Sequence, residues 1–149
     1  MNNSTNNTTQ KLIEAFVKIK KLHRTEGPIY DLKHSEIFVL FCIKKSKNSD
    51  SEGLKISEIS NYMKVTNPTT TQVVNGLEQK GYVKRCVDKE DKRVVRITLT
   101  SKGEEATVRA SHKLTNFFEG LTGYLGEEKS LMLADLINDV YKYFDENKK

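Results

Sequence analysis

Residues 56–99 combine two short helical patterns, a tight turn and a hairpin pattern, and this order constrains the fold more than any other feature of the chain. The spacing of one helical face is marked by Ile56, Ile59 and Met63, then by Thr70, Val73, Val74 and Leu77. Between them, Thr66 or Asn67 can cap the second helix, and Pro68 is tolerated in its first turn. Gly81 can adopt the left-handed conformation that ends a helix. The sequence therefore predicts a helix–turn–helix.

A hairpin pattern follows directly. Residues 82–87 are rich in β-forming side chains, residues 88–93 are all charged, and Val95, Ile97 and Leu99 recur at every second position. These features predict two antiparallel strands around a charged loop. A helix–turn–helix followed by such a hairpin indicates a winged helix.

Helical spacing also marks both flanks of this unit. The predicted helices span residues 9–25, 34–45, 101 to about 125, and about 127 to 144. The second contains the longest apolar run, seven residues, and is predicted to be buried nearly all round. Ser101 and Glu104 have the spacing of a capping box. The predicted fold class is mainly α (α+β), a winged helix-turn-helix core flanked by helices.

The terminal helices carry more apolar surface than a small winged core can cover. This surface comprises Leu12, Phe16, Ile19, Leu133, Leu136, Val140 and Phe144. Two copies of the chain can bury it mutually, which predicts a homodimer. The alternative is a monomeric bundle in which these helices cover one another.

The charge distribution and the motifs of the sequence limit the classes of function that the chain can have. The first 100 residues hold 18 basic and 11 acidic side chains, net +7, whereas the last 49 hold 7 and 9, net −2. A basic body favours a polyanionic partner such as DNA, although a merely basic protein is the alternative. Enzyme motifs, cofactor fingerprints and a membrane-spanning run are missing, so we expect a cytoplasmic non-enzyme without a cofactor or metal. Two cysteines are too few for a disulfide scaffold.

The outward face of the second helix of the pair is small, polar and uncharged, which suits a DNA major groove. Gln and Asn can pair with adenine, and Thr methyl groups can pack on thymine. The candidate contacts are Thr66, Asn67, Pro68, Thr69, Thr71, Gln72 and Asn75. An ordinary solvated face is the alternative, and a protein-binding module would instead need an apolar face here.

The charged loop supplies the candidates for a second DNA contact, namely Lys89, Lys92 and Arg93. An arginine at a hairpin tip can enter a narrow, A·T-rich minor groove, where the potential is most negative. Asp91 either holds the Arg93 guanidinium by a charge-assisted bond or shapes the turn.

From about Leu12 to Phe144, and most specifically over residues 77–103, the sequence resembles the MarR-type winged-helix transcriptional regulators. The match is most specific at Asp91-x-Arg93 and at Leu99-Thr-x-Lys-Gly103. The resemblance implies a homodimer on a pseudo-palindromic operator, usually a repressor released by a small ligand or by cysteine oxidation. It assigns Arg93 to the minor groove. Many members have an arginine at the position of Gln72, so its absence here favours an A·T-richer site.

These inferences predict a disordered tail over residues 1–8, a winged-helix DNA-binding domain over 31–100, and a helical dimerisation region over 9–30 and 101–149. A pocket for a small aromatic or anionic ligand between the two regions would be lined by Phe16, His23, Tyr30, Phe38, Phe41, Arg109 and His112. A cysteine-responsive or metal-responsive sensor is the less favoured alternative, since no two metal ligands share helical spacing.

Overall fold

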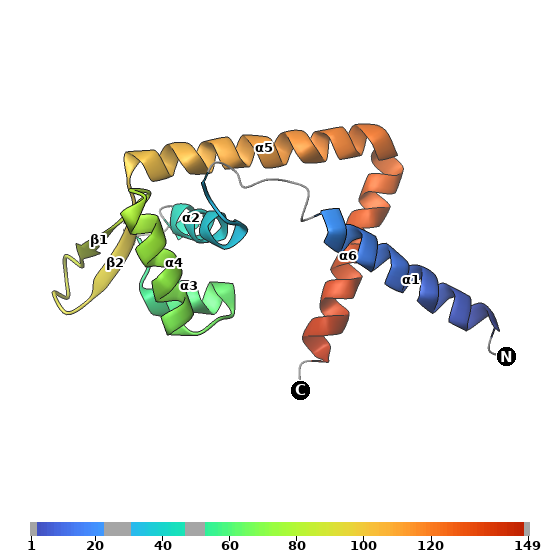
Figure 1. Ribbon diagram of the computed structural model, residues 1–149, viewed down its shortest axis with the longest axis horizontal. Coiled ribbons are helices and arrows are strands. Elements are labelled where there is room, and N and C mark those ends of the chain that lie inside the picture. Colours follow the sequence, from blue (N-terminus) through green and yellow to red (C-terminus); the bar gives the residue numbers. More distant parts are fainter. Residues whose placement is uncertain (1–2, 23–30, 47–52, 148–149) are drawn as a thin grey trace.

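The computed structural model describes residues 3–22, 31–46 and 53–147. Two helices, a helix–turn–helix, a hairpin and two long helices follow in the predicted order (Figure 1). The elements are α1 (Asn3–Leu22), α2 (His34–Ser46), α3 (Ile56–Met63), α4 (Asn67–Gln79), β1 (Val83–Val87), β2 (Val95–Leu99), α5 (Ser101–Leu125) and α6 (Glu127–Glu146). The fold is a mainly helical winged helix-turn-helix, as predicted.

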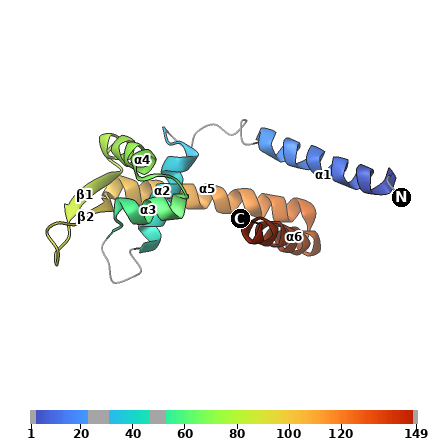
Figure 2. The ribbon, with the colours of Figure 1, turned by 90° about the horizontal axis from the view of Figure 1, so that it is seen from below.

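One hydrophobic core joins α2, α3, α4, the hairpin and the first half of α5 (Figure 2). Its fully buried side chains include Leu32, Val39, Leu40, Ile59, Val74, Leu77 and Ile97. Helix α2 lies at the centre of this core, but it is not buried all round as predicted. Phe38 is 46% exposed, because the neighbouring elements cover only one side of the helix.

A buried hydrogen bond ties the two helices of the helix–turn–helix together. The Ser60 hydroxyl on α3 lies 2.9 Å from the Thr70 hydroxyl on α4, and both residues are buried. The Thr66 side chain caps α4 by accepting a hydrogen bond from the backbone N–H of Thr69. Gly81, with a φ of 79°, follows α4 in the left-handed conformation that the sequence predicts.

The hairpin forms where the sequence predicts it, and a third segment anchors it. Strands β1 and β2 pair antiparallel from Val83 opposite Leu99 to Val87 opposite Val95. On its other edge, β2 also pairs with the segment before α3, where the backbone of Leu54 exchanges hydrogen bonds of 3.0 and 2.7 Å with Ile97. Ile97 therefore lies between two backbone partners.

One predicted boundary and one predicted helix cap are wrong. Helix α1 begins at Asn3, whereas the sequence predicts a disordered tail over residues 1–8. No glycine or proline interrupts residues 3–8, and extending a helix that is already nucleated avoids the cost of nucleation. Helix α5 is capped by Thr100, whose side chain accepts from Gly103 N–H at 3.1 Å, and Ser101 is already helical. The predicted Ser101–Glu104 capping box is therefore not formed, because the cap lies one residue earlier and position 103 is a glycine.

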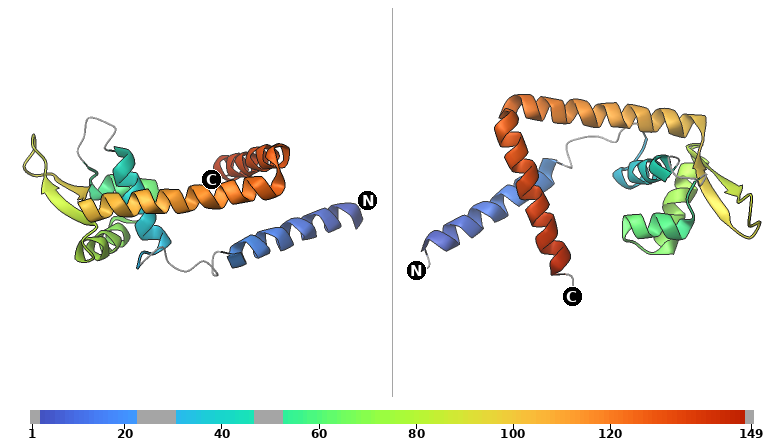
Figure 3. Two further views of the ribbon diagram at one scale, coloured as in Figure 1. Left: turned by 90° about the horizontal axis from the view of Figure 1, so that it is seen from above. Right: turned by 180° about the vertical axis from the view of Figure 1, so that it is seen from behind.

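Helix α5 extends far beyond the core, and α6 turns back from its far end (Figure 3). No side chain described in α1 or α6 is buried. Exposed apolar residues gather on these helices and on the far half of α5: Leu12, Phe16, Ile19, Leu114, Phe117, Phe118, Leu133, Leu136, Val140 and Phe144. The monomeric bundle is thus not the arrangement observed. Among the described residues, no helix combines the length and apolar character that crossing a bilayer requires.

Substituting Gly53 tests the contact between residues 53–54 and β2. Gly53 has a φ of 88°, and an added Cβ would lie 2.4 Å from the backbone oxygen of Ile97. We expect Gly53→Ala to lower the free energy of unfolding by about 2–4 kcal/mol, from left-handed strain plus overpacking. Denaturant unfolding at one fixed protein concentration measures the change.

Gly120→Ala is the matched control, because a Cβ there meets nothing within 4 Å and its φ is ordinary. It should leave stability unchanged or raise it by up to about 1 kcal/mol. Equal stability of the two alanine variants would contradict the structural role of Gly53.

Candidate nucleic-acid interface

The exposed face of α4 is formed as the sequence predicts from its helical spacing. The side chains that it exposes are Thr66, Asn67, Pro68, Thr69, Gln72 and Asn75, with Thr71 half-buried. Two of the hydroxyls form hydrogen bonds with the backbone of α4. Thr66 caps the helix, and Thr71 donates to the backbone oxygen of Asn67 at 2.9 Å. The threonine methyl groups and the amide side chains of Asn67, Gln72 and Asn75 are therefore the groups that this face offers to a partner.

The two amides on this face have different surroundings. Within the described part of the chain, the Gln72 side chain makes no hydrogen bond or ion pair. The Asn75 amide oxygen instead accepts a hydrogen bond of 2.8 Å from the Arg85 guanidinium on β1. Arg85 also forms an ion pair with Glu78, one turn further along α4. Asn75 is therefore fixed, and Gln72 is free to rotate.

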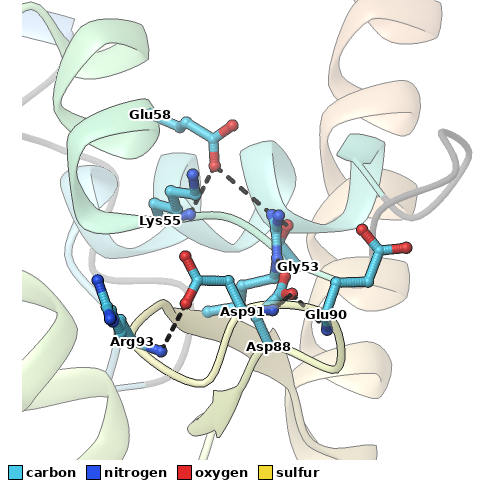
Figure 4. A network of polar contacts seen from close by, with 8 residues as sticks. Gly53, Lys55, Glu58, Asp88, Glu90, Asp91 and Arg93 are labelled. Carbon is cyan, nitrogen blue, oxygen red and sulfur yellow. Dashed lines mark hydrogen bonds and ion pairs between the residues drawn. The ribbon is translucent and has the colours of Figure 1, made fainter.

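The loop of the wing is shaped by two aspartates (Figure 4). Asp88 Oδ1 accepts hydrogen bonds of 2.9 and 3.0 Å from the backbone N–H groups of Glu90 and Asp91. Asp91 Oδ1 in turn accepts a hydrogen bond of 2.9 Å from the backbone N–H of Arg93. These bonds hold the loop in one conformation with its basic side chains outside it.

Arg96 anchors this loop to the helix–turn–helix. Its guanidinium forms an ion pair with the other Asp88 oxygen, donates to the backbone oxygen of Gly53 at 3.3 Å, and lies 3.9 Å from a Glu58 oxygen on α3. The hydrogen bond from Arg96, helped by the backbone N–H groups, holds the pKa of the Asp88 carboxyl well below its usual range. The same pairing raises the pKa of Arg96.

The three basic candidates of the wing, Lys89, Lys92 and Arg93, all lie on the exposed loop. Asp91 bonds to the backbone of Arg93, and the Arg93 guanidinium forms no ion pair with a described residue. The predicted bond between the Asp91 carboxylate and that guanidinium is therefore wrong. The alternative, in which Asp91 shapes the turn, is the arrangement observed, because the short side chain reaches the nearer backbone donor.

A second polar network holds the end of α4. The Lys80 ammonium lies 3.0 Å from both oxygens of the buried Glu36 carboxylate on α2. Tyr82 donates a hydrogen bond of 2.8 Å to Asp31, which lowers the pKa of that carboxyl. Burial and the bond to Asp31 raise the pKa of Tyr82 to about 12. Polar contacts therefore fix α4 against the segment that leads into α2.

The predicted ligand-pocket residues are distributed over several elements. Phe16 lies on α1, Phe38 and Phe41 on α2, and Arg109 and His112 on α5, while His23 and Tyr30 lie outside the described residues. Two shallow hollows lie on the exposed faces of α5 and α1, and only Phe16 of the predicted set lines one of them. The ligand pocket stays a prediction.

The cysteines and possible metal ligands do not form a recognisable reactive centre. Cys42 and Cys86 are both unpaired and half-buried, and burial raises the pKa of the Cys42 thiol. A raised pKa lowers the thiolate fraction that reacts with oxidants. Within residues 3–22, 31–46 and 53–147, no three acidic, histidine or cysteine side chains are placed to share a metal ion.

Sequence reasoning missed three residues that organise this surface: Arg85, Asp88 and Arg96. A signal was present for Asp88 and Arg96, because they are opposite charges at the two ends of the short hairpin loop. Arg85 gave no comparable signal, since its partners lie 7 and 10 residues away on a different element.

A family model and several known proteins are similar in sequence to this chain. The model of the MarR family matches residues 32–95. The HTH-type transcriptional regulator PrsX of Escherichia coli is 32% identical over 109 residues, which cover 73% of this chain and 63% of PrsX. The match thus spans less than two thirds of that relative. SarZ of Staphylococcus epidermidis, also an HTH-type transcriptional regulator, is 29% identical over 78% of this chain and 74% of SarZ.

Solved structures share the fold at lower identity. Streptococcus pneumoniae FabT in complex with DNA has a TM-score of 0.69 and 21% identity, over 97% of this chain and 98% of FabT. YusO of Bacillus subtilis has the same TM-score and identity, over 94% of this chain and 99% of YusO.

The anchoring of the wing by Asp88 predicts a pH dependence of stability. A carboxyl whose folded pKa is depressed stabilises the fold above its unfolded pKa, about 3.9, and loses this effect as the pH falls towards its folded value. The stability difference between wild type and Asp88→Asn should therefore be complete above about pH 4 and shrink below it. Denaturant unfolding from pH 6 to pH 3 measures this difference.

Glu119→Gln on α5 controls for the loss of one exposed carboxylate elsewhere. A difference between wild type and Asp88→Asn that stays constant over the whole pH range would contradict the role given to the Asp88 carboxylate.

Proposed function

We propose that the chain is a sequence-specific DNA-binding transcriptional regulator of the MarR type, the family whose model matches residues 32–95. The observation that carries this proposal is the polar, uncharged face of α4 next to a rigidly anchored basic wing. The complex of FabT with DNA supports it, as a protein of the same fold. A protein-binding module is not favoured, because the exposed face of α4 offers no apolar anchor.

We assign α4 to the major groove and the wing to the adjacent minor groove. The α4 face that starts at Thr66 and reaches Asn75 offers methyl groups and amides, which match thymine methyls and the edges of bases. Arg93 extends from the wing with its guanidinium outside the ion pairs that hold the loop. A guanidinium in this state suits the negative potential of a narrow A·T-rich groove.

The functional unit in this proposal is a homodimer on a pseudo-palindromic operator. The exposed apolar faces of α1, the far half of α5 and α6 support it, since a soluble monomer rarely exposes apolar surface on this scale. A two-fold dimer places two α4 helices on two half-sites that are related by the same symmetry.

Regulation by a ligand is the second half of the proposal. We propose that a small aromatic or anionic effector binds between the dimerisation helices and the winged core. We also propose that the protein acts as a repressor. We place the protein in the reducing cytoplasm, where two unpaired cysteines are usual.

Removal of the Arg93 side chain tests the assignment of the wing. We expect Arg93→Ala to weaken binding to the DNA upstream of its own gene by about 1–3 kcal/mol, because one groove contact is lost. Fluorescence anisotropy at fixed salt measures the affinity, with a scrambled duplex as the reference.

Lys129→Ala is the control for charge, since it removes one positive charge from the first turn of α6. The junction of α5 and α6 lies far from the wing (Figure 1). Equal affinities of Arg93→Ala and Lys129→Ala would remove Arg93 from the interface.

A charge on the apolar face of α6 tests the dimer. Wild type should sediment at micromolar concentration as twice the 17.1 kDa chain, whereas Leu136→Asp should sediment as a single chain. Asn138→Asp adds the same charge on the polar side of α6 and should leave the dimer intact. A wild-type protein that sediments only as a single chain would contradict the dimer.

A further inference from the structure

The guanidinium of Arg85 joins the wing to the exposed face of α4. Arg85 lies on β1, opposite Ile97 of β2. One of its nitrogens pairs with the Glu78 carboxylate, and another donates to Asn75 Oδ1 at 2.8 Å. Both partners lie on α4 three residues apart, so a single side chain of the wing contacts two neighbouring positions of the helix.

This contact fixes which end of the Asn75 amide faces outward. A guanidinium carries only hydrogen-bond donors, so the atom of Asn75 that faces it must be the oxygen. The reversed amide would place its own N–H groups against those of Arg85 and lose the bond. Glu78 holds the guanidinium from its other side, which keeps this arrangement in place.

Asn75 lies on the part of α4 that we assign to the major groove. It follows Gln72 by three residues and Thr71 by four, so all three share one face of the helix. Its side chain is exposed, and within the described part of the chain its only hydrogen bond is the one from Arg85. The amide nitrogen is therefore available to a ligand.

We propose that Asn75 is a specificity-determining residue that reads the major groove as a donor only, with Arg85 as its positioning residue. This inference rests on the proposed DNA binding. A free asparagine pairs with adenine through both amide atoms, because adenine presents one donor and one acceptor. With its oxygen turned toward Arg85, Asn75 presents only its N–H donors to the groove. Guanine offers these donors two acceptors, N7 and O6, whereas adenine offers only N7 and thymine only O4.

The two amides of α4 then read different bases. Gln72, without a partner, retains the donor and acceptor that adenine requires. Asn75, one turn later, favours guanine, which presents two acceptors. The half-site would therefore hold one position that prefers adenine and a neighbouring position that prefers guanine.

The experiment is selection of binding sites from a randomised duplex pool, with four variants beside wild type. Asn75→Ala identifies the base position that Asn75 reads. The double variant Glu78→Ala, Arg85→Met frees the amide without changing the net charge. Glu78→Ala alone retains the Arg85–Asn75 bond, and Arg85→Lys retains a donor-only cation next to Asn75.

We expect wild type, Glu78→Ala and Arg85→Lys to prefer guanine over adenine at that position. In the double variant this preference should fall by about tenfold in favour of adenine, the scale of one paired base contact. Asn75→Ala should lose the preference altogether. Thermal unfolding of each variant checks that its fold is intact.

Three results would overturn the inference while leaving DNA binding in place. The first is a double variant with the wild-type profile. The second is a uniform loss of affinity in Asn75→Ala without a change of profile, which would mean a phosphate contact. The third is a wild-type preference for adenine at the Asn75 position. If wild type selected no sequence at all, the proposed function would fail together with the inference.

Discussion

The backbone pairing of Leu54 with Ile97 is the contact on which the arrangement of the proposed DNA-binding surface depends. It makes β2 the middle of three paired segments, and it brings Gly53 so close to β2 that no Cβ fits there. The same approach places the backbone oxygen of Gly53 within reach of Arg96, which holds Asp88 and thereby the loop of the wing. The wing is therefore oriented by the core that precedes α3, and only its tip is shaped by the charged turn itself.

Polar contacts hold α4 at both ends, and they differ in how far they are buried. Near its start, the hydroxyls of Ser60 and Thr70 meet in the interior, where an unpaired polar group would be costly. After its end, Lys80 pairs with Glu36, a carboxylate that is only 6% exposed. Loss of Lys80 would leave the buried Glu36 carboxylate without its cation. The exposed face of α4 thus has little freedom to tilt, as suits a surface that reads another molecule.

The sequence predicts the local elements well, because each depends on nearby residues. The helix–turn–helix, the Thr66 cap and the hairpin follow from spacing and from turn chemistry within a few positions. The groups that orient the site are different, since Arg85 and Arg96 act on residues from other elements. Side-chain pairing at a distance leaves no periodic signal in one sequence. Asp91 illustrates the limit: its place in the turn is predictable, but its choice of the backbone over the guanidinium is not.

Helix α5 is long and continuous, so a small rotation at one end moves its other end over a large distance. Thr100 caps it beside the wing, Gly103 packs against Tyr82 with no room for a Cβ, and its 25 residues form one continuous rod of about 37 Å. A pivot of about 5° at one end of such a rod displaces the other by about 3 Å. The successive major-groove sites of a duplex repeat every 34–36 Å or so. In the proposed dimer on DNA, a small change of angle where the apolar ends of two such rods meet would be amplified into a misfit with the half-sites, so that α5 would act as a lever.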